Sequence, residues 1–265
     1  MSRITGVFRT GHKALIGYIT VGYPDIKATP EIVTALAENG CDIIELGIPF
    51  SDPLADGATI QKASYEALVK GTTPKACVEI AAEVRNRVTV PLLFMTYYNP
   101  VLNYGLKHFC RSCVNAGING LIVPDLPPEE GTELEALTSA SGLDLVYLLA
   151  PTSTEDRITT VAERSRGFIY MVSLTGVTGA RETLPPELED FVHRVRKKAR
   201  QPLCVGFGIA TPEQAQRVAA IADGVIIGSR IIQLIEEDTT LARLCSFISG
   251  MRKALDTFEI AKEVS

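Results

Sequence analysis

The sequence predicts an α/β fold, a closed barrel of eight parallel strands with helices around it, and three observations support this prediction. Short, almost continuously apolar runs recur along the 265 residues, 46% of which are hydrophobic. Segments with helical periodicity separate the runs, so that strand and helix alternate eight times between Leu15 and about Glu237. The length suits one such barrel. We therefore expect a (β/α)8 TIM barrel with extra helices, built as a single domain over residues 1–265.

The predicted strands lack the polar alternation of a half-exposed sheet, which is typical of strands covered on both faces. An open doubly wound sheet is the alternative. It usually has fewer strands and a glycine-rich nucleotide fingerprint in its first strand-to-helix turn, but that turn reads TVGYPD here. The strand count therefore favours the barrel. The runs read LIGYITV, DIIELGI, PLLFMTYY, GLIVPDL, DLVYLLA, FIYMVSL, PLCVGFG and GVIIG.

Three predicted helices have the same start signal, a threonine followed by a proline. The threonines are Thr29, Thr73 and Thr211. A threonine hydroxyl can cap the free N–H groups of the first turn, and proline suits the first helical position. Gln214 lies three residues after Thr211 and completes a capping box.

Composition excludes several classes of partner. The net charge is -5 with scattered acidic residues, so we expect neither nucleic acid nor an anionic membrane as a partner. No apolar run approaches the roughly 18 residues of a membrane span. The six cysteines lie mostly within predicted strands or helices, as suits a reducing compartment. We expect a cytoplasmic protein; the alternative is a plastid stroma, if a transit peptide has been removed.

Metal and redox chemistry find little support in the sequence. Cys110 and Cys113 have the spacing C-x-x-C, but a zinc site needs a second ligand pair. A redox motif should open a helix, whereas this pair lies inside a predicted helix from about Asn103 to Ala116. The three histidines lie away from the predicted strand ends. We therefore expect no metal in the site.

Glu45 is the first candidate for catalysis. It lies near the end of the second predicted strand, where barrel enzymes place active-site residues. Burial in an apolar frame would raise its pKa toward the range that a general acid or base needs. An ion pair or hydrogen bond to a neighbouring strand is the structural alternative.

Asp52 and Asp56 follow in the loop SDPLADG, where one of them could act as a second carboxylate. Any tight turn also favours these residue types.

Glycine-rich loops follow predicted strands six, seven and eight, where barrels of this kind bind phosphate. The segment after Gly228 suits a short helix whose N-terminus attracts an anion, and Ser229 adds a hydroxyl there. No nucleophile elbow is present, and the lysines lie mostly on helices. The sequence therefore favours proton transfer by carboxylates on a phosphorylated substrate.

The stretches ELGIPFSDPLADG, YMVSLTGVTG, GFGI and IIGS together resemble the tryptophan synthase α subunit family, over about Leu15 to Ile235. The resemblance implies retro-aldol cleavage of indole-3-glycerol phosphate to indole and glyceraldehyde 3-phosphate in tryptophan biosynthesis. It implies no cofactor in this subunit. It also implies a β-subunit partner that holds pyridoxal phosphate, in an α2β2 heterotetramer.

The resemblance also implies roles for individual residues. Glu45 would protonate indole C3 and then take the proton of the C3′ hydroxyl, while Asp56 would accept the indole N–H and offset the ring charge. Tyr170 would lie beside the glutamate. Some members have arginine where this chain has Leu174, so their loop-closure contacts do not carry over. The other implied positions are Tyr18, Met95, Ile122, Val172 and Phe207 around the indole; Gly179, Gly208, Gly228 and Ser229 around the phosphate; Thr178 in a lid; and Pro49, Asp52 and Pro53 at the partner interface.

Other functions remain as alternatives. A stand-alone lyase would keep the chemistry and release free indole. A sugar-phosphate isomerase or epimerase would share the phosphate loops, but such enzymes usually need a histidine, lysine or metal at the strand ends. A non-catalytic module that only activates the β subunit would not require both Glu45 and Asp56.

Overall fold

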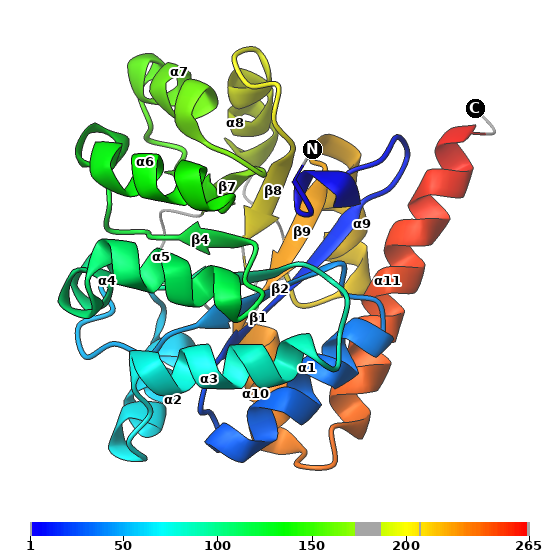
Figure 1. The fold of residues 1–265 in the computed structure, drawn as a ribbon. Coiled ribbons are helices and arrows are strands. Elements are labelled where there is room, and N and C mark those ends of the chain that lie inside the picture. The colour runs from blue at the N-terminus through cyan, green and yellow to red at the C-terminus, as the bar shows by residue number, and fades with distance from the viewer. Residues whose placement is uncertain (1, 173–186, 207, 264–265) are drawn as a thin grey trace.

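The computed structural model describes residues 2–172, 187–206 and 208–263, with side chains up to Thr257. Figure 1 shows strands gathered at the centre and helices around them. All nine described strands run parallel to their neighbours, in the order β5-β4-β3-β2-β1-β9-β8-β7-β6. The strands are β1 (Ala14–Thr20), β2 (Ile43–Gly47), β3 (Leu92–Met95), β4 (Gly120–Ile122), β5 (Asp144–Val146), β6 (Leu148–Leu149), β7 (Ile169–Val172), β8 (Leu203–Gly206) and β9 (Gly224–Ile227).

The nine strands occupy eight positions in the barrel, because β5 and β6 are separated only by Tyr147 and together form one position. β5 pairs with β4 on one side, and β6 pairs with β7 on the other. The Tyr147 carbonyl also accepts a hydrogen bond from the Tyr170 N–H at 3.0 Å. The interrupted segment thus acts as the fifth strand and closes the ring, which confirms the predicted barrel.

Helices cover the outside of the barrel and include extra ones, as predicted. The long C-terminal helix α11 (Ala242–Glu263) packs against α9 (Pro212–Ile221) and α1 (Thr29–Glu38) (Figure 1). Among the described residues, none of the helices combines the length and the apolar character that crossing a membrane requires. The helices are α1 (Thr29–Glu38), α2 (Ala58–Val69), α3 (Pro74–Arg85), α4 (Tyr98–Tyr104), α5 (Leu106–Asn115), α6 (Thr132–Ser141), α7 (Glu155–Arg164), α8 (Glu187–Arg196), α9 (Pro212–Ile221), α10 (Ser229–Glu237) and α11 (Ala242–Glu263), with short 3-10 turns η1 (Thr5–Val7), η2 (Ile26–Ala28) and η3 (Pro128–Glu130).

Two of the three predicted helix starts are confirmed. The Thr73 hydroxyl caps α3, and Thr211 forms the full capping box with Gln214 at the start of α9. The prediction for Thr29 is wrong. A 3-10 turn leads directly into α1, so Thr29 is its first residue, and its hydroxyl instead accepts a hydrogen bond from the Gly22 N–H at 3.2 Å.

The C-x-x-C pair lies inside a helix, as predicted. Cys110 and Cys113 are both free thiols, buried on the inner side of α5. The predicted helix is divided in two, because Gly105 adopts a φ of 90° between α4 and α5.

The alternation of side chains along β2 determines where Glu45 points. Ile43 belongs to the cluster that fills the barrel interior, while Ile44 and Leu46 belong to the larger core beneath the helices. Because side chains on a strand alternate between its two faces, Glu45 faces the interior with Ile43. The acid therefore lies inside the barrel, two residues before the end of β2 from which the active-site loop emerges.

Candidate active site

Glu45 is fully buried, and neither of its carboxylate oxygens has a hydrogen-bond partner among the described residues. Its strand neighbours are Tyr18 on β1 and Leu93 on β3. Burial away from water raises its pKa from 4.5 to about 8. A carboxyl with this pKa carries its proton at neutral pH, so Glu45 can donate a proton there. No ion pair or hydrogen bond to a neighbouring strand appears in the described part of the chain.

Two tyrosines lie near this acid, and a glycine makes room for each. An added Cβ at Gly47 would lie 2.2 Å from the Tyr18 hydroxyl oxygen, and one at Gly206 would lie 2.9 Å from that of Tyr170. A larger residue at either glycine would displace the phenol next to it. The glycine of the E-L-G stretch thus allows Tyr18 to lie across the strand end beside Glu45.

The tyrosine hydroxyls share the low-dielectric surroundings of the two acids. Burial raises the pKa of Tyr170 well above its usual value, and the charges of Glu45 and Asp56 raise it further. Burial, and to a smaller extent the charge of Asp56, also raises the pKa of Tyr18 well above its usual value. The Tyr18 hydroxyl shares a hydrogen bond with the Thr20 hydroxyl at 3.2 Å. Both phenols therefore remain protonated and are available as hydrogen-bond donors.

Asp56 lies in the loop between β2 and α2 and is half-buried. Burial raises its pKa from 3.8 to about 6, and a hydrogen bond from Tyr97 lowers the pKa and so opposes this rise. The Tyr97 hydroxyl also accepts a hydrogen bond from the Ala55 N–H at 3.0 Å. At neutral pH Asp56 is thus ionised while Glu45 is protonated. Two carboxyls with separated pKa values are the arrangement that acid and base roles require.

Tyr97 is a site residue that the sequence analysis did not identify. It lies two residues after β3, is buried, and packs its ring against Phe50 at a centroid distance of 5.3 Å. Its position near the end of the third predicted strand, PLLFMTYY, was a usable signal, since active-site residues of barrels gather at strand ends. Only the folded structure brings it to Asp56.

The predicted phosphate-binding helix is present as α10, which begins at Ser229. Among the described residues no side chain caps its first turn, so its N–H groups are available to an anion. Gly228 lies against Tyr18, because an added Cβ would be 3.4 Å from that ring. The start of α10 therefore lies close to the strand that neighbours Glu45. Gly208, in the loop after β8, has a φ of 68° that favours glycine.

The other predicted site residues fall into two groups. Met95 and Ile122 are register partners on β3 and β4, Ile122 fully buried in the interior cluster and Met95 half-buried beside it. Val172 is half-buried at the end of β7. Phe207, Thr178, Gly179 and Leu174 lie outside the described residues.

The predicted interface residues are unequally accessible. Asp52 is exposed and accepts a hydrogen bond from the Ser51 hydroxyl at 2.5 Å. Pro53 is half-buried, whereas Pro49 is buried and presents little surface to a partner. Leu54, which the sequence analysis did not consider, is 93% exposed in the same loop. Within the described part of the chain, no group of three or more His, Cys, Asp or Glu residues could hold a metal ion.

The buried acid makes a prediction about stability. The unfolded chain loses the Glu45 proton near pH 4.5 and the folded chain near pH 8, so folding binds a proton between these values. The wild type therefore loses stability as the pH rises through this window. Glu45→Gln cannot ionise, so its free energy of unfolding should exceed that of the wild type by a margin that grows to roughly 4 kcal/mol at pH 8. Urea titrations from pH 4.5 to 9 measure this margin, with Glu38→Gln on the exposed face of α1 as the control. A margin independent of pH would contradict the buried, unpaired state.

The chain is similar to known proteins over almost its whole length. Residues 6–255 match the sequence profile of the family described as "Tryptophan synthase alpha chain". The tryptophan synthase alpha chain of Dehalococcoides mccartyi is 57% identical over 256 residues, covering 97% of this chain and 100% of that protein. That of Chloroflexus aggregans is 46% identical, covering 98% of this chain and 99% of that protein.

Solved structures show the same architecture. A chain of Mycobacterium tuberculosis tryptophan synthase superposes with a TM-score of 0.91 at 39% identity, covering 96% of this chain and 98% of that one. The tryptophan synthase subunit alpha of Legionella pneumophila gives a TM-score of 0.89 at 34% identity, covering 97% and 99%. These similarities extend over nearly the whole of each chain. With its barrel and its buried strand-end acid, the protein belongs to the tryptophan synthase alpha chain family.

Proposed function

We propose that Glu45 and Asp56 catalyse the lyase reaction of this family, the cleavage of indole-3-glycerol phosphate to indole and glyceraldehyde 3-phosphate. The observation that carries the proposal is the pair of separated pKa values, about 8 for Glu45 and about 6 for Asp56. At neutral pH these leave one acid protonated and the other ionised.

The steps follow from these protonation states. Glu45 gives its proton to indole C3, and the ring becomes positively charged. Asp56 accepts a hydrogen bond from the indole N–H and offsets that charge. The carboxylate of Glu45 then takes the proton of the C3′ hydroxyl, the C3–C3′ bond breaks, and its electron pair returns to the ring. Indole and an aldehyde result, and Glu45 again holds a proton.

Binding of the substrate phosphate is assigned to the start of α10. The uncapped N–H groups after Gly228, the positive end of the helix dipole and the Ser229 hydroxyl all favour an anion. Gly208 and Gly179 are proposed to complete this site, with Thr178 in a closing lid. The proposed apolar pocket for the indole ring is lined by Tyr18, Met95, Ile122, Val172 and Phe207. Tyr170 lies next to Glu45.

A β subunit is the proposed partner, in an α2β2 assembly in which only the partner holds pyridoxal phosphate. Asp52 and the 93% exposed Leu54 would meet it in the loop that also carries Asp56. Docking on this loop would affect the position of Asp56, because the Tyr97 hydroxyl accepts from Ala55 and bonds Asp56. The same route would couple partner binding to catalysis.

Indole release tests the function directly. Purified chain is mixed with indole-3-glycerol phosphate, alone and with a tryptophan synthase β subunit. We expect slow release that rises sharply when the β subunit is added, and a loss of nearly all release in Glu45→Gln. Fast release that ignores the β subunit would identify a stand-alone lyase. No release in either condition, or wild-type turnover in Glu45→Gln, would refute the proposed chemistry.

The pH dependence tests the two roles. The active form has Glu45 protonated and Asp56 ionised, so kcat/KM should fall below about pH 6 and above about pH 8. Tyr97→Phe removes a hydrogen bond that lowers the pKa of Asp56, so its acid limb should move to higher pH while its alkaline limb stays. The substrate phosphate also titrates near pH 6 and affects both proteins equally. The test is therefore the difference in pH between the acid limbs of the variant and the wild type. Tyr98→Phe, the next residue, is the control. Coincident acid limbs in wild type and Tyr97→Phe would contradict the role of this hydrogen bond.

The phosphate site makes a prediction about affinity. Ser229→Asp places a negative charge at the first residue of α10, against the substrate phosphate. We expect KM to rise by about tenfold or more, the equivalent of about 1.4 kcal/mol. Ser139→Asp adds the same charge at an exposed position of α6 and controls for net charge. An unchanged KM in Ser229→Asp would place the phosphate elsewhere.

A further inference from the structure

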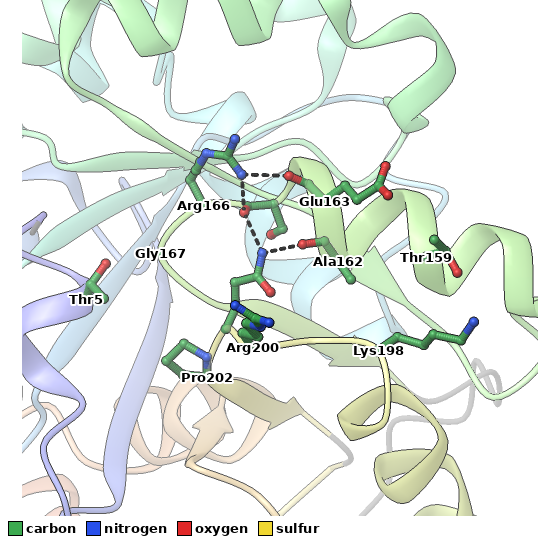
Figure 2. Close-up of a pocket in the computed structure, with 11 residues that line it drawn as sticks. Thr5, Thr159, Ala162, Glu163, Arg166, Gly167, Lys198, Arg200 and Pro202 are labelled. Atoms are coloured by element: carbon green, nitrogen blue, oxygen red, sulfur yellow. Dashed lines mark hydrogen bonds between the residues drawn. The ribbon is translucent and has the colours of Figure 1, made fainter.

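A cavity lies among the segments that precede β7 and β8, and Figure 2 shows the residues that line it. Its volume is about 490 Å³, within the range of small-molecule sites. The end of α7, the turn before β7 and the segment before β8 form it. Active-site loops of barrels follow the carboxyl ends of the strands, whereas these segments precede the amino ends. The cavity is therefore separate from the proposed active site.

Positive charge predominates around this cavity. Arg166 comes from the turn before β7, and Lys198 and Arg200 come from the segment before β8 (Figure 2). Glu163 is the one acidic residue among those that line it. Asp144 does not line the cavity, but it packs against Gly167 and its charge interacts with that of Arg166, so part of the Arg166 charge is already offset. On a chain with a net charge of -5, such a local excess of cations points to an anion.

The three basic side chains differ in how many hydrogen bonds they already form within the protein. Arg166 donates through one nitrogen to the carbonyl oxygens of Glu163 and Ser165, at 2.8 and 3.0 Å. Its other guanidinium nitrogens have no hydrogen bond within the described chain. The side chains of Lys198 and Arg200 are exposed and form neither an ion pair nor a hydrogen bond with any residue that the structure describes. Lys198 and Arg200 can therefore engage a ligand without breaking a described contact, and Arg166 can do so through the nitrogens that its two carbonyl bonds leave unused.

The frame beneath these side chains is held in place. The Gln201 amide donates to the carbonyl oxygens of Ala162 and Ser165, at 2.5 and 3.1 Å (Figure 2). The Ser165 hydroxyl in turn donates to the Phe168 carbonyl at 2.7 Å. These bonds join the end of α7 to the segment before β8. The backbone that carries the cations is thus preorganised, which reduces the entropic cost of binding.

We infer that this cavity binds a small phosphorylated metabolite, of the size of a sugar phosphate. Guanidinium groups match the geometry of phosphate oxygens and bind them with charge-assisted hydrogen bonds. The hydroxyls of Thr5 and Thr159 already bond Ser2 and the Glu155 carbonyl, so they can act toward ligand hydroxyls as acceptors, as the carboxylate of Glu163 can. The volume exceeds the needs of a bare phosphate ion, which is the reason for including the sugar portion.

An amide-resolved titration tests this site without any reference to catalysis. Ribose 5-phosphate is added to the 15N-labelled full chain at constant ionic strength, and the amide shifts are followed. We expect saturable shifts at Ser165–Gly167 and Lys198–Gln201. The double variant Lys198→Ala/Arg200→Ala should bind about tenfold more weakly or worse at these amides, since it loses two charged donors. Both side chains are exposed, and the same spectrum shows whether the variant is folded.

Controls separate this site from other sources of binding. Lys197→Ala removes an exposed charge that does not line the cavity and should leave the affinity unchanged. Shifts at Gly228 and Ser229 report the catalytic phosphate site separately, so failure of one site does not imply failure of the other. Equal affinity for ribose, or for inorganic phosphate, would overturn the assignment to a sugar phosphate. Absence of saturable shifts at the cavity, or equal weakening in Lys197→Ala, would overturn the site itself.

Discussion

The carboxyl group of Glu45 lies in an apolar barrel interior, and the organisation of the site depends on this single unfavourable placement. Neither of its oxygens has a partner among the described residues, so the acid is tolerated there chiefly as the neutral form. The same burial that costs stability keeps a proton on the group up to about pH 8. A large apolar core on both faces of the sheet supplies the stability that offsets this cost. A strained or desolvated group of this kind is what a functional site typically retains.

The two carboxyls differ because the fold places them in different environments. Glu45 comes from a strand and is enclosed by the barrel, whereas Asp56 comes from a loop and is half-buried. Tyr97 then favours the ionised form of Asp56 through its hydrogen bond. Glycines at the ends of β2 and β8 allow Tyr18 and Tyr170 to lie close to the acids. Small differences in enclosure and hydrogen bonding thus separate the two pKa values on one rigid scaffold.

The barrel also explains how functions can be placed at its two ends without interference. The loops after the strands carry Asp56 and the start of α10, and the segments before β7 and β8 carry the basic cavity. The interior between these ends is filled by packed side chains of the interior cluster, among them Ile16, Leu93 and Phe168. Each end can therefore bind its own ligand on a common core.

The sequence by itself determined the eight strand–helix units, the start of α10 and two of the three helix caps, because apolar periodicity and capping are local signals. It also marked Glu45 as an acid at a strand end. Only the tertiary structure decided that Glu45 faces the interior with no hydrogen-bond partner in the described part of the chain, that Tyr97 reaches Asp56, and that the fifth strand is divided at Tyr147. It also corrected Thr29, whose hydroxyl bonds Gly22 instead of capping α1. These features arise from contacts between segments that are distant in the chain or from the exact path of a turn, and a pattern along the sequence does not specify either.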